Sequence, residues 1–241
     1  MTKKILVLIA IILLFQVKII LSQNSNWHFG LKINYGFTNF KLNDLNKYIN
    51  SVFQQFKSKD IPHKLDKISS GNFWDAELII KPHKLMAFSI GIMPEFKAEK
   101  NYNISLNEND ETNLYIKAGG IPRYFSAYLY IPSSYFYIEP FINLKLGNIQ
   151  KAELIVKNVD KKTGIVEDYT LTGKTNYISI STGFDYRWKR FLIITTSVGY
   201  QFSKVNSLKD RSGNTVHIEN TGKFTLDFSG TFLETGIKLI L

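Results

Sequence analysis

The sequence predicts an all-β fold: an eight-stranded antiparallel up-and-down transmembrane β-barrel with a short amphipathic helix in the first external loop. The first observation is a strict alternation of residue types. In 27–40 the odd positions are mostly aromatic or aliphatic, and the even positions are mostly polar or small. Successive strand side chains point to opposite faces, so such a segment has one apolar and one polar face. The second observation is that charged residues share their face with Gly, Ser and Asn, which suits a narrow lumen behind an apolar outer wall.

The N-terminus has the features of a secretory signal peptide. Two lysines precede an apolar run at 5–15, and Lys18 interrupts the run before Ser22. The clean run is shorter than the roughly 20 residues that a spanning helix requires, so a membrane anchor is disfavoured. We therefore expect cleavage near Ser22, which divides the chain into a signal peptide, 1–22, and an outer-membrane β-barrel domain, 23–241.

Alternating segments recur along the rest of the chain, and the gaps between them are alternately long and short. The expected strands are 27–40, 72–81, 85–97, 112–131, 134–148, 175–188, 191–203 and 224–241. Bacterial barrels have short periplasmic turns and longer external loops, so this order places both termini in the periplasm. The alternative is a soluble eight-stranded barrel of the lipocalin kind, which would put its bulky apolar residues inside and its charges outside.

Two of the long gaps have structure of their own. The first contains apolar residues at helical spacing, which predicts an amphipathic helix near 42–56 with Asn43 or Asp44 at its start. The apolar positions are Leu42, Leu45, Ile49, Val52, Phe53 and Phe56. Such a helix could be a lid or docking element, or it could pack on the barrel rim or rest in the lipid headgroups. The second gap, 150–174, is expected to form a hairpin that projects beyond the membrane.

The polar face of the expected strands carries both signs of charge. Because an eight-stranded barrel is just wide enough to be filled by side chains, we expect these groups to pair across the lumen. A polar path for a small ion is the functional alternative. The expected lumen charge network comprises Lys32, Asp75, Glu77, Glu95, Glu139, Lys145, Asp185, Arg187, Glu234 and Lys238.

Catalytic, cofactor and metal sites are not expected. The chain has no Cys, which removes disulfides, thiol catalysis and thiolate metal sites. Its four histidines, at 28, 63, 83 and 217, cannot be placed beside a matching nucleophile. The formal net charge of +10 comes from scattered residues and not from the clustered stripe of a nucleic-acid binder. Attraction to outer-membrane lipid and anionic lipopolysaccharide is the more natural use of this charge.

Four segments resemble the outer-membrane β-barrel domain proteins of Gram-negative bacteria, the porin-family group of small eight-stranded barrels. These segments are Phe29–Gly36, Ile121-Pro122, Tyr137–Leu144 and Gly236–Leu241. The resemblance implies integration in the outer membrane after insertion from the periplasm by the barrel-assembly machinery. It implies no single activity, because one fold hosts many functions.

The expected function is therefore a structural or surface-interaction role, carried by the external loops of an integral outer-membrane protein. A protein partner could bind those loops, since loops on a rigid scaffold are common binding sites. Two alternatives remain open: a narrow channel for small solutes, and a membrane subunit of a secretion or assembly complex.

Overall fold

The computed structural model describes residues 28–57, 66–107, 110–132, 137–160, 166–218 and 222–240. The expected signal peptide, 1–22, and its cleavage point lie outside the described residues. Strand content dominates the described part, and one helix, α2 (Asn43–Lys57), accompanies it. No helix there is long and apolar enough to cross a membrane.

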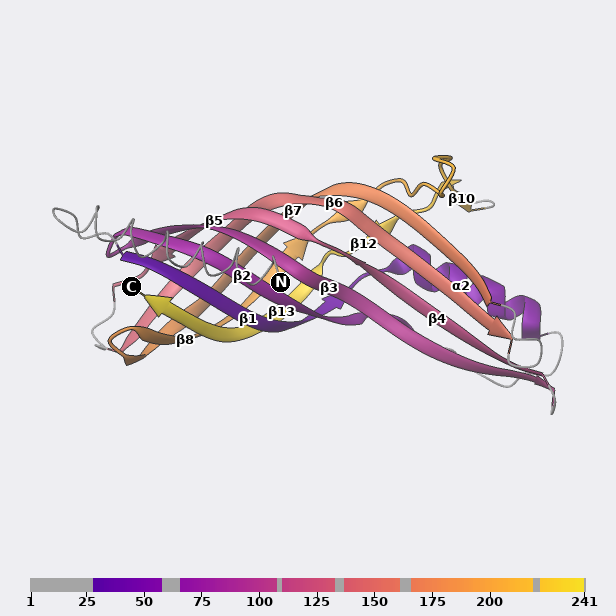
Figure 1. The fold of residues 1–241 in the computed structure, drawn as a ribbon, viewed down its shortest axis with the longest axis horizontal. Coiled ribbons are helices and arrows are strands. Elements are labelled where there is room, and N and C mark those ends of the chain that lie inside the picture. Colours follow the sequence, from indigo (N-terminus) through magenta and orange to yellow (C-terminus); the bar gives the residue numbers. More distant parts are fainter. Residues whose placement is uncertain are drawn as a thin grey trace, which may run out of the picture.

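Nine long strands form one closed antiparallel sheet (Figure 1). They are β1 (His28–Phe40), β2 (Ser70–His83), β3 (Met86–Asn107), β4 (Asp110–Gly120), β5 (Pro122–Tyr130), β6 (Ile138–Asp160), β7 (Val166–Lys189), β8 (Leu192–Phe202) and β13 (Gly230–Ile240). β13 pairs back to β1, from Gly30 opposite Ile240 to Phe40 opposite Gly230, and this closes the ring. β4 and β5 are one strand interrupted at Ile121, before a proline that cannot donate to the ladder. The described ring therefore has the eight positions that the alternation predicts.

The outer wall of the ring is apolar. Each of the eight positions presents exposed large hydrophobic side chains, exemplified in ring order by Leu31, Leu78, Ile90, Phe125, Ile142, Ile180, Val198 and Leu233. On β7 the outward band runs from Ile178 to Trp188, which matches the roughly 9–11 residues that a tilted strand needs to cross a bilayer. A soluble barrel would bury these side chains. The inverted arrangement makes this chain a transmembrane β-barrel of the outer-membrane type.

The two ends of the barrel differ. The start of β1, the end of β13 and the short connections after β2, β5 and β7 lie at one end, and α2 lies at the other (Figure 1). We call these the turn end and the extension end. Four strands (β3, β4, β6 and β7) continue past the apolar band at the extension end and form a sheet there, which we call the extension.

The extension confirms one expected hairpin and corrects one expected loop. β6 and β7 pair from Ala152 opposite Gly173 to Val159 opposite Val166, which confirms a hairpin within 150–174. At about 3.3 Å per residue, 152–160 alone spans roughly 30 Å. Residues 98–107, which lie in a gap between two expected strands, instead continue β3 and pair with β4. Neither face of this segment contacts lipid, so the sequence there lacks the alternation of apolar and polar residues that identified the other strands.

A bulge corrects the predicted face of Glu95. The pairing of β2 with β3 shifts between Trp74 and Ala76, which stand opposite Glu95 and Ile92. The one extra residue on β3 reverses its alternation, as bulges do. Glu95 therefore lies on the outside, with its side chain 45% exposed, and Phe96 points inward with 1% exposure. The expectation that Glu95 faces the lumen is wrong.

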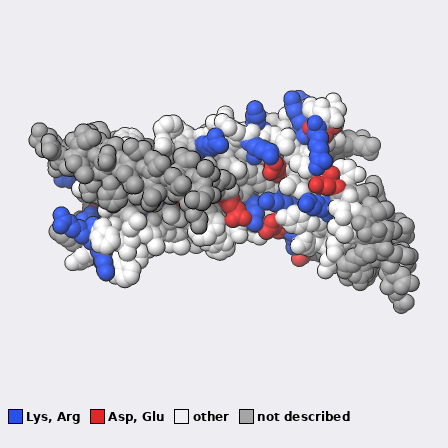
Figure 2. Space-filling view, viewed as in Figure 1, with Lys and Arg blue, Asp and Glu red and all other residues white. Residues whose placement is uncertain are grey.

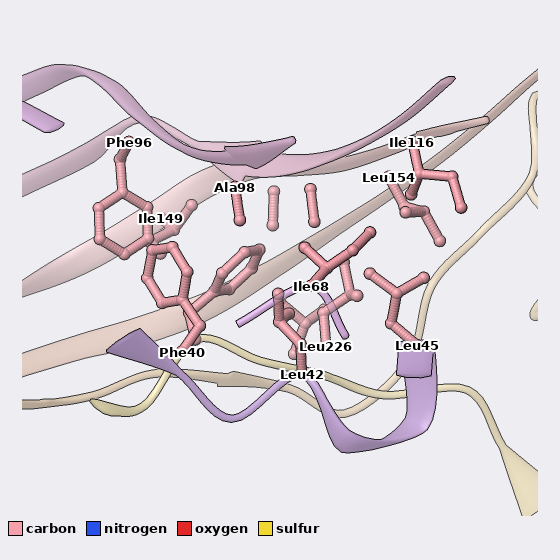
Figure 3. Packing of buried hydrophobic residues seen from close by; sticks show 14 of the residues in the cluster. Phe40, Leu42, Leu45, Ile68, Phe96, Ala98, Ile116, Ile149, Leu154 and Leu226 are labelled. Atoms are coloured by element: carbon pink, nitrogen blue, oxygen red, sulfur yellow. The ribbon is translucent and has the colours of Figure 1, made fainter. Parts of the chain in front are cut away.

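α2 packs its apolar face against the inner side of the extension (Figure 3). Leu42, Leu45 and Ile49 are buried, and Figure 3 shows Leu45 facing Ile116 and Leu154 of the sheet. The helix prediction is confirmed in type and position, and the apolar face covers the core at the barrel mouth. The expected positions Val52, Phe53 and Phe56 have side chains outside the described set.

The residue before α2 has a strained backbone conformation, which the burial of its side chain stabilises. Leu42 precedes the helix with a φ of 34°, in the left-handed region that a leucine rarely adopts. Its side chain is fully buried, and its N–H donates to the Asp227 carbonyl at 3.0 Å. Asp44, one of the two predicted caps, lies in the first turn and accepts a hydrogen bond from Thr225.

Asn46 should contribute measurably to stability. Its side-chain amide donates to the Ile68 carbonyl at 2.9 Å, and its oxygen accepts from the Ile68 N–H at 2.8 Å. Asn46→Ala leaves both buried groups of Ile68 unpaired, so the free energy of unfolding should fall by about 1–3 kcal/mol. Asn50→Ala, one turn later on the exposed face, is the control and should stay within about 0.5 kcal/mol. Equal stability of the two variants in urea titrations would contradict this role.

Candidate functional site in the lumen and on the extension

A group of buried charges lies inside the barrel, within the apolar band. Lys145 Nζ lies 2.5 Å from an Asp75 oxygen, 3.3 Å from Glu77 and 3.4 Å from Glu234. Lys32 Nζ lies 3.3 Å from Glu77 and 3.4 Å from Glu234. All five side chains are at most 3% exposed. Two lysines are therefore shared among three carboxylates, and we call this group the central cluster.

Hydroxyl groups complete the central cluster. Tyr128 and Ser89 each donate to Glu77 at 2.6 Å, and Tyr124 donates to Asp75. A buried charge is tolerated only when its remaining hydrogen-bonding capacity is satisfied, and these donors serve the excess carboxylate oxygens.

A smaller charged pair adjoins the central cluster, since its Lys238 ammonium lies 5.3 Å from the centre of the Tyr128 ring. Lys238 donates to Asp185 and, at 3.0 Å, to the hydroxyl of Tyr130. Tyr130 in turn donates to Asp185 at 3.2 Å, and the Lys238 ammonium lies 5.5 Å from the Tyr130 ring centre. This pair shares the packed interior with Phe141.

Two predicted lumen residues lie in a more exposed ion-pair group. Glu139 accepts from Lys81 at 2.8 Å and from Arg187 at 2.9 Å. The side chains of Glu139 and Arg187 are 31% and 44% exposed. Of the ten predicted lumen charges, seven are buried inside, Glu139 and Arg187 belong to this group, and Glu95 is outside.

Two tyrosines of β5 face the lumen. Tyr128 and Tyr130 are aromatic residues beside a turn, a pattern that fits either a girdle at the membrane interface or an aromatic-rich sheet. They are 2% and 4% exposed and point into the lumen with Ser126. The burial pattern of β5 alternates without a break, so Phe125 and Leu129 face outward. The shared face with Ser126 was the signal available in the sequence.

Aromatic side chains fill the interior on the extension side of the central cluster. Tyr177, Phe73, Phe96 and Phe228 are each at most 1% exposed, and the ring of Phe96 meets Tyr177 edge to face and Phe228 at a tilt. Tyr124 lies across Gly91, where an added Cβ would come within 2.4 Å of its ring. Phe40 and the α2 core continue this packing outward. The described interior is thus occupied by side chains at successive levels.

The outer face of the extension is charged. Lys97 lies 2.7 Å from Glu95 and 3.2 Å from Glu99. Tyr115 donates to Glu99 at 2.8 Å, and this hydrogen bond holds the pKa of Glu99 below its usual value. Figure 2 shows charged residues of both signs gathered over the half of the molecule that contains the extension, with a basic group at the opposite end.

One edge of the extension has backbone groups available for pairing. Thr172 exchanges two hydrogen bonds of 2.8 Å with Lys209, so its N–H and C=O point away from β6. Alternate residues of a strand repeat this orientation, which directs the same groups of Thr170 and Asp168 to that edge. Within the described residues these groups have no strand partner on that side. Arg211 lies 3.6 Å from Asp168 and partly covers the edge.

Comparison with solved structures finds outer-membrane proteins similar to this chain. A major outer membrane protein of Thermus thermophilus is 9% identical, with 89% of this chain and 99% of that chain covered and a TM-score of 0.48. Ail, the attachment invasion locus protein of Yersinia pestis, is 8% identical, with 89% and 99% covered and a TM-score of 0.42. The outer membrane protease OmpT of Escherichia coli is 9% identical, with 90% and 98% covered and a TM-score of 0.37.

No family model and no curated protein matches the chain. The barrel fold of this chain rests on its own strand pairing and burial, described above. The absence of enzymatic activity stays a prediction.

Proposed function

We propose that this protein is a surface-recognition protein, anchored in the outer membrane of a Gram-negative bacterium by its barrel after removal of a signal peptide. The extension end faces the outside, and the extension carries the recognition. The observation that supports this most is the contrast between the two parts. The lumen is filled by paired charges and aromatic rings, whereas four strands continue well beyond the apolar band.

A passive channel is the less favoured function. Conduction needs a continuous polar path, and the side chains of the central cluster are nearly unexposed. Opening it would separate Lys145 from three carboxylates within a low-dielectric interior, at a cost of several kcal/mol. The buried charges therefore act as a structural plug in this proposal.

Strand addition at the β7 edge is the mode of recognition that the geometry supports. A free edge offers N–H and C=O groups to an extended segment, and the partner's side chains then add specificity. Val166 and Tyr169, near this edge, are 59% and 60% exposed. The proposed partner is an extended protein segment outside the cell.

Peptide selection tests this proposal directly. Peptides from a random displayed library are selected on the full barrel held in lipid nanodiscs. Thr170→Pro should reduce binding of the selected peptides about tenfold, because proline removes the edge N–H and is tolerated on edge strands. Thr170→Val keeps that N–H and is the matched control. Peptides that bind both variants equally, or stable ion conductance of the intact protein in planar bilayers, would contradict the proposed function.

A further inference from the structure

The outer wall contains a long apolar furrow that the described side chains leave open. One hollow of about 500 Å³ is lined by Leu31, Leu78, Ile90 and Phe125, with Arg123 and Asn148 at its border. A second hollow of about 300 Å³ has these same four apolar residues in its lining and continues toward Phe29 and Ile80. The shared lining makes the two hollows one furrow across β1, β2, β3 and β5.

A small outward residue produces this furrow. Ala76 is the outward residue of β2 between Trp74 and Leu78, and its methyl group leaves a gap among larger neighbours. Gly91 and Gly147 also line the furrow, although their missing side chains face Tyr124 in the interior. Phe125 is 72% exposed and borders the furrow as a projecting side chain. An unfilled gap loses dispersion contacts on one side, so an occupant of matching shape is favoured.

Arg123 supplies a positive charge at the extension end of the furrow. It is exposed, and it stands opposite Ile92 of β3 and Asn148 of β6 in the sheet. No described carboxylate forms an ion pair with it. It lies on β5 at the extension end of the outward apolar series that continues through Phe125 and Leu129. A guanidinium group at this boundary matches the two oxygens of a phosphate better than an ammonium group does.

We propose that the furrow binds one phosphorylated, multiply acylated glycolipid of the outer leaflet, of the lipid A class. An acyl chain occupies the apolar furrow from Phe125 toward Phe29, and a phosphate of the sugar headgroup binds Arg123. Asn148 supplies a neutral hydrogen-bonding group beside that phosphate. The assignment to the outer leaflet rests on the orientation in the proposed function, because Arg123 is at the extension end.

Native mass spectrometry of the full barrel in detergent provides the test. The probes are lipid A, the same lipid A without its phosphates, phosphatidylglycerol and phosphatidylcholine. Wild-type protein should retain one lipid A, and loss of the phosphates should weaken binding about tenfold. Arg123→Gln should weaken lipid A binding by a similar factor. Ala76→Phe, which fills the furrow, should weaken binding of both forms of lipid A.

Two control variants match these changes. Lys189→Gln removes an exposed cation at the turn end, and Ala127→Phe enlarges an outward alanine of β5 that does not line the furrow. Both should bind lipid A like the wild type. Equal weakening by Lys189→Gln, unchanged binding by Arg123→Gln, or phosphatidylglycerol binding as tight as lipid A would overturn the assignment. A barrel that shows the heat-dependent gel shift of a folded barrel but retains no lipid A would refute this site alone and leave the proposed recognition function standing.

Discussion

Lys145→Met should destabilise the folded barrel by about 3–5 kcal/mol, the largest effect that we expect from a single lumen substitution. Methionine fills a similar volume, so the loss is mainly electrostatic. The change leaves Asp75, Glu77 and Glu234 with only Lys32 to balance them inside a dry interior. Urea titration of the protein in lipid vesicles, followed by the shift in gel mobility between folded and heated samples, measures the free energy of unfolding.

A double variant and a variant of an exposed ion pair serve as controls for this result. Asp75→Asn in the Lys145→Met background removes one unpaired carboxylate and should recover part of the lost stability. Arg187→Gln breaks an ion pair whose members are 44% and 31% exposed, so it should cost no more than about 1 kcal/mol. If Lys145→Met costs no more than Arg187→Gln, the central cluster does not stabilise the barrel as we infer.

Ile142→Arg should lower the stability of the barrel in lipid vesicles by about 2–4 kcal/mol, because it places a charge on the lipid-facing wall near the bilayer centre. Ile142 is outward on β6 and 41% exposed. Ile155→Arg, on the same strand in the extension, is the matched control and should change stability by no more than about 0.5 kcal/mol, since water is available there. The same vesicle unfolding assay compares them. Equal costs would show that the apolar band does not end between these two positions.

Local periodicity explains why most of the barrel was predictable. A strand in contact with lipid on one side and a filled lumen on the other must alternate residue by residue, so Leu31 and Lys32 reveal their faces without knowledge of their partners. α2 was predictable for the same reason with a different period, since Leu42, Leu45 and Ile49 repeat at helical spacing.

Predictions failed where the face that a residue occupies depends on the neighbouring strand. They also failed where a strand extends beyond the lipid, so that apolar and polar residues need not alternate. Glu95 and Phe96 exchanged faces because a bulge opposite β2 shifts the register, and register belongs to a pair of strands and not to one. Residues 98–107 were assigned to a loop because water, and not lipid, lies beyond the apolar band. Tyr128 and Tyr130 suit either a girdle or a lumen by residue type, and their position in the ladder decided between them.

The sequence by itself determined the eight-position ring, with its apolar outer wall and polar lumen, and the helix. It also determined the residue types of the lumen. Each of these features follows from periodicity within one segment. Tertiary structure alone decided which charges meet. Lys145 and Asp75 are 70 residues apart, and their 2.5 Å contact exists only because the closed sheet lets side chains of β6 and β2 meet across a narrow lumen. The furrow with Arg123 at its extension end is likewise a property of adjacent strands, since its hollow arises where a small residue of one strand lies beside large residues of the next.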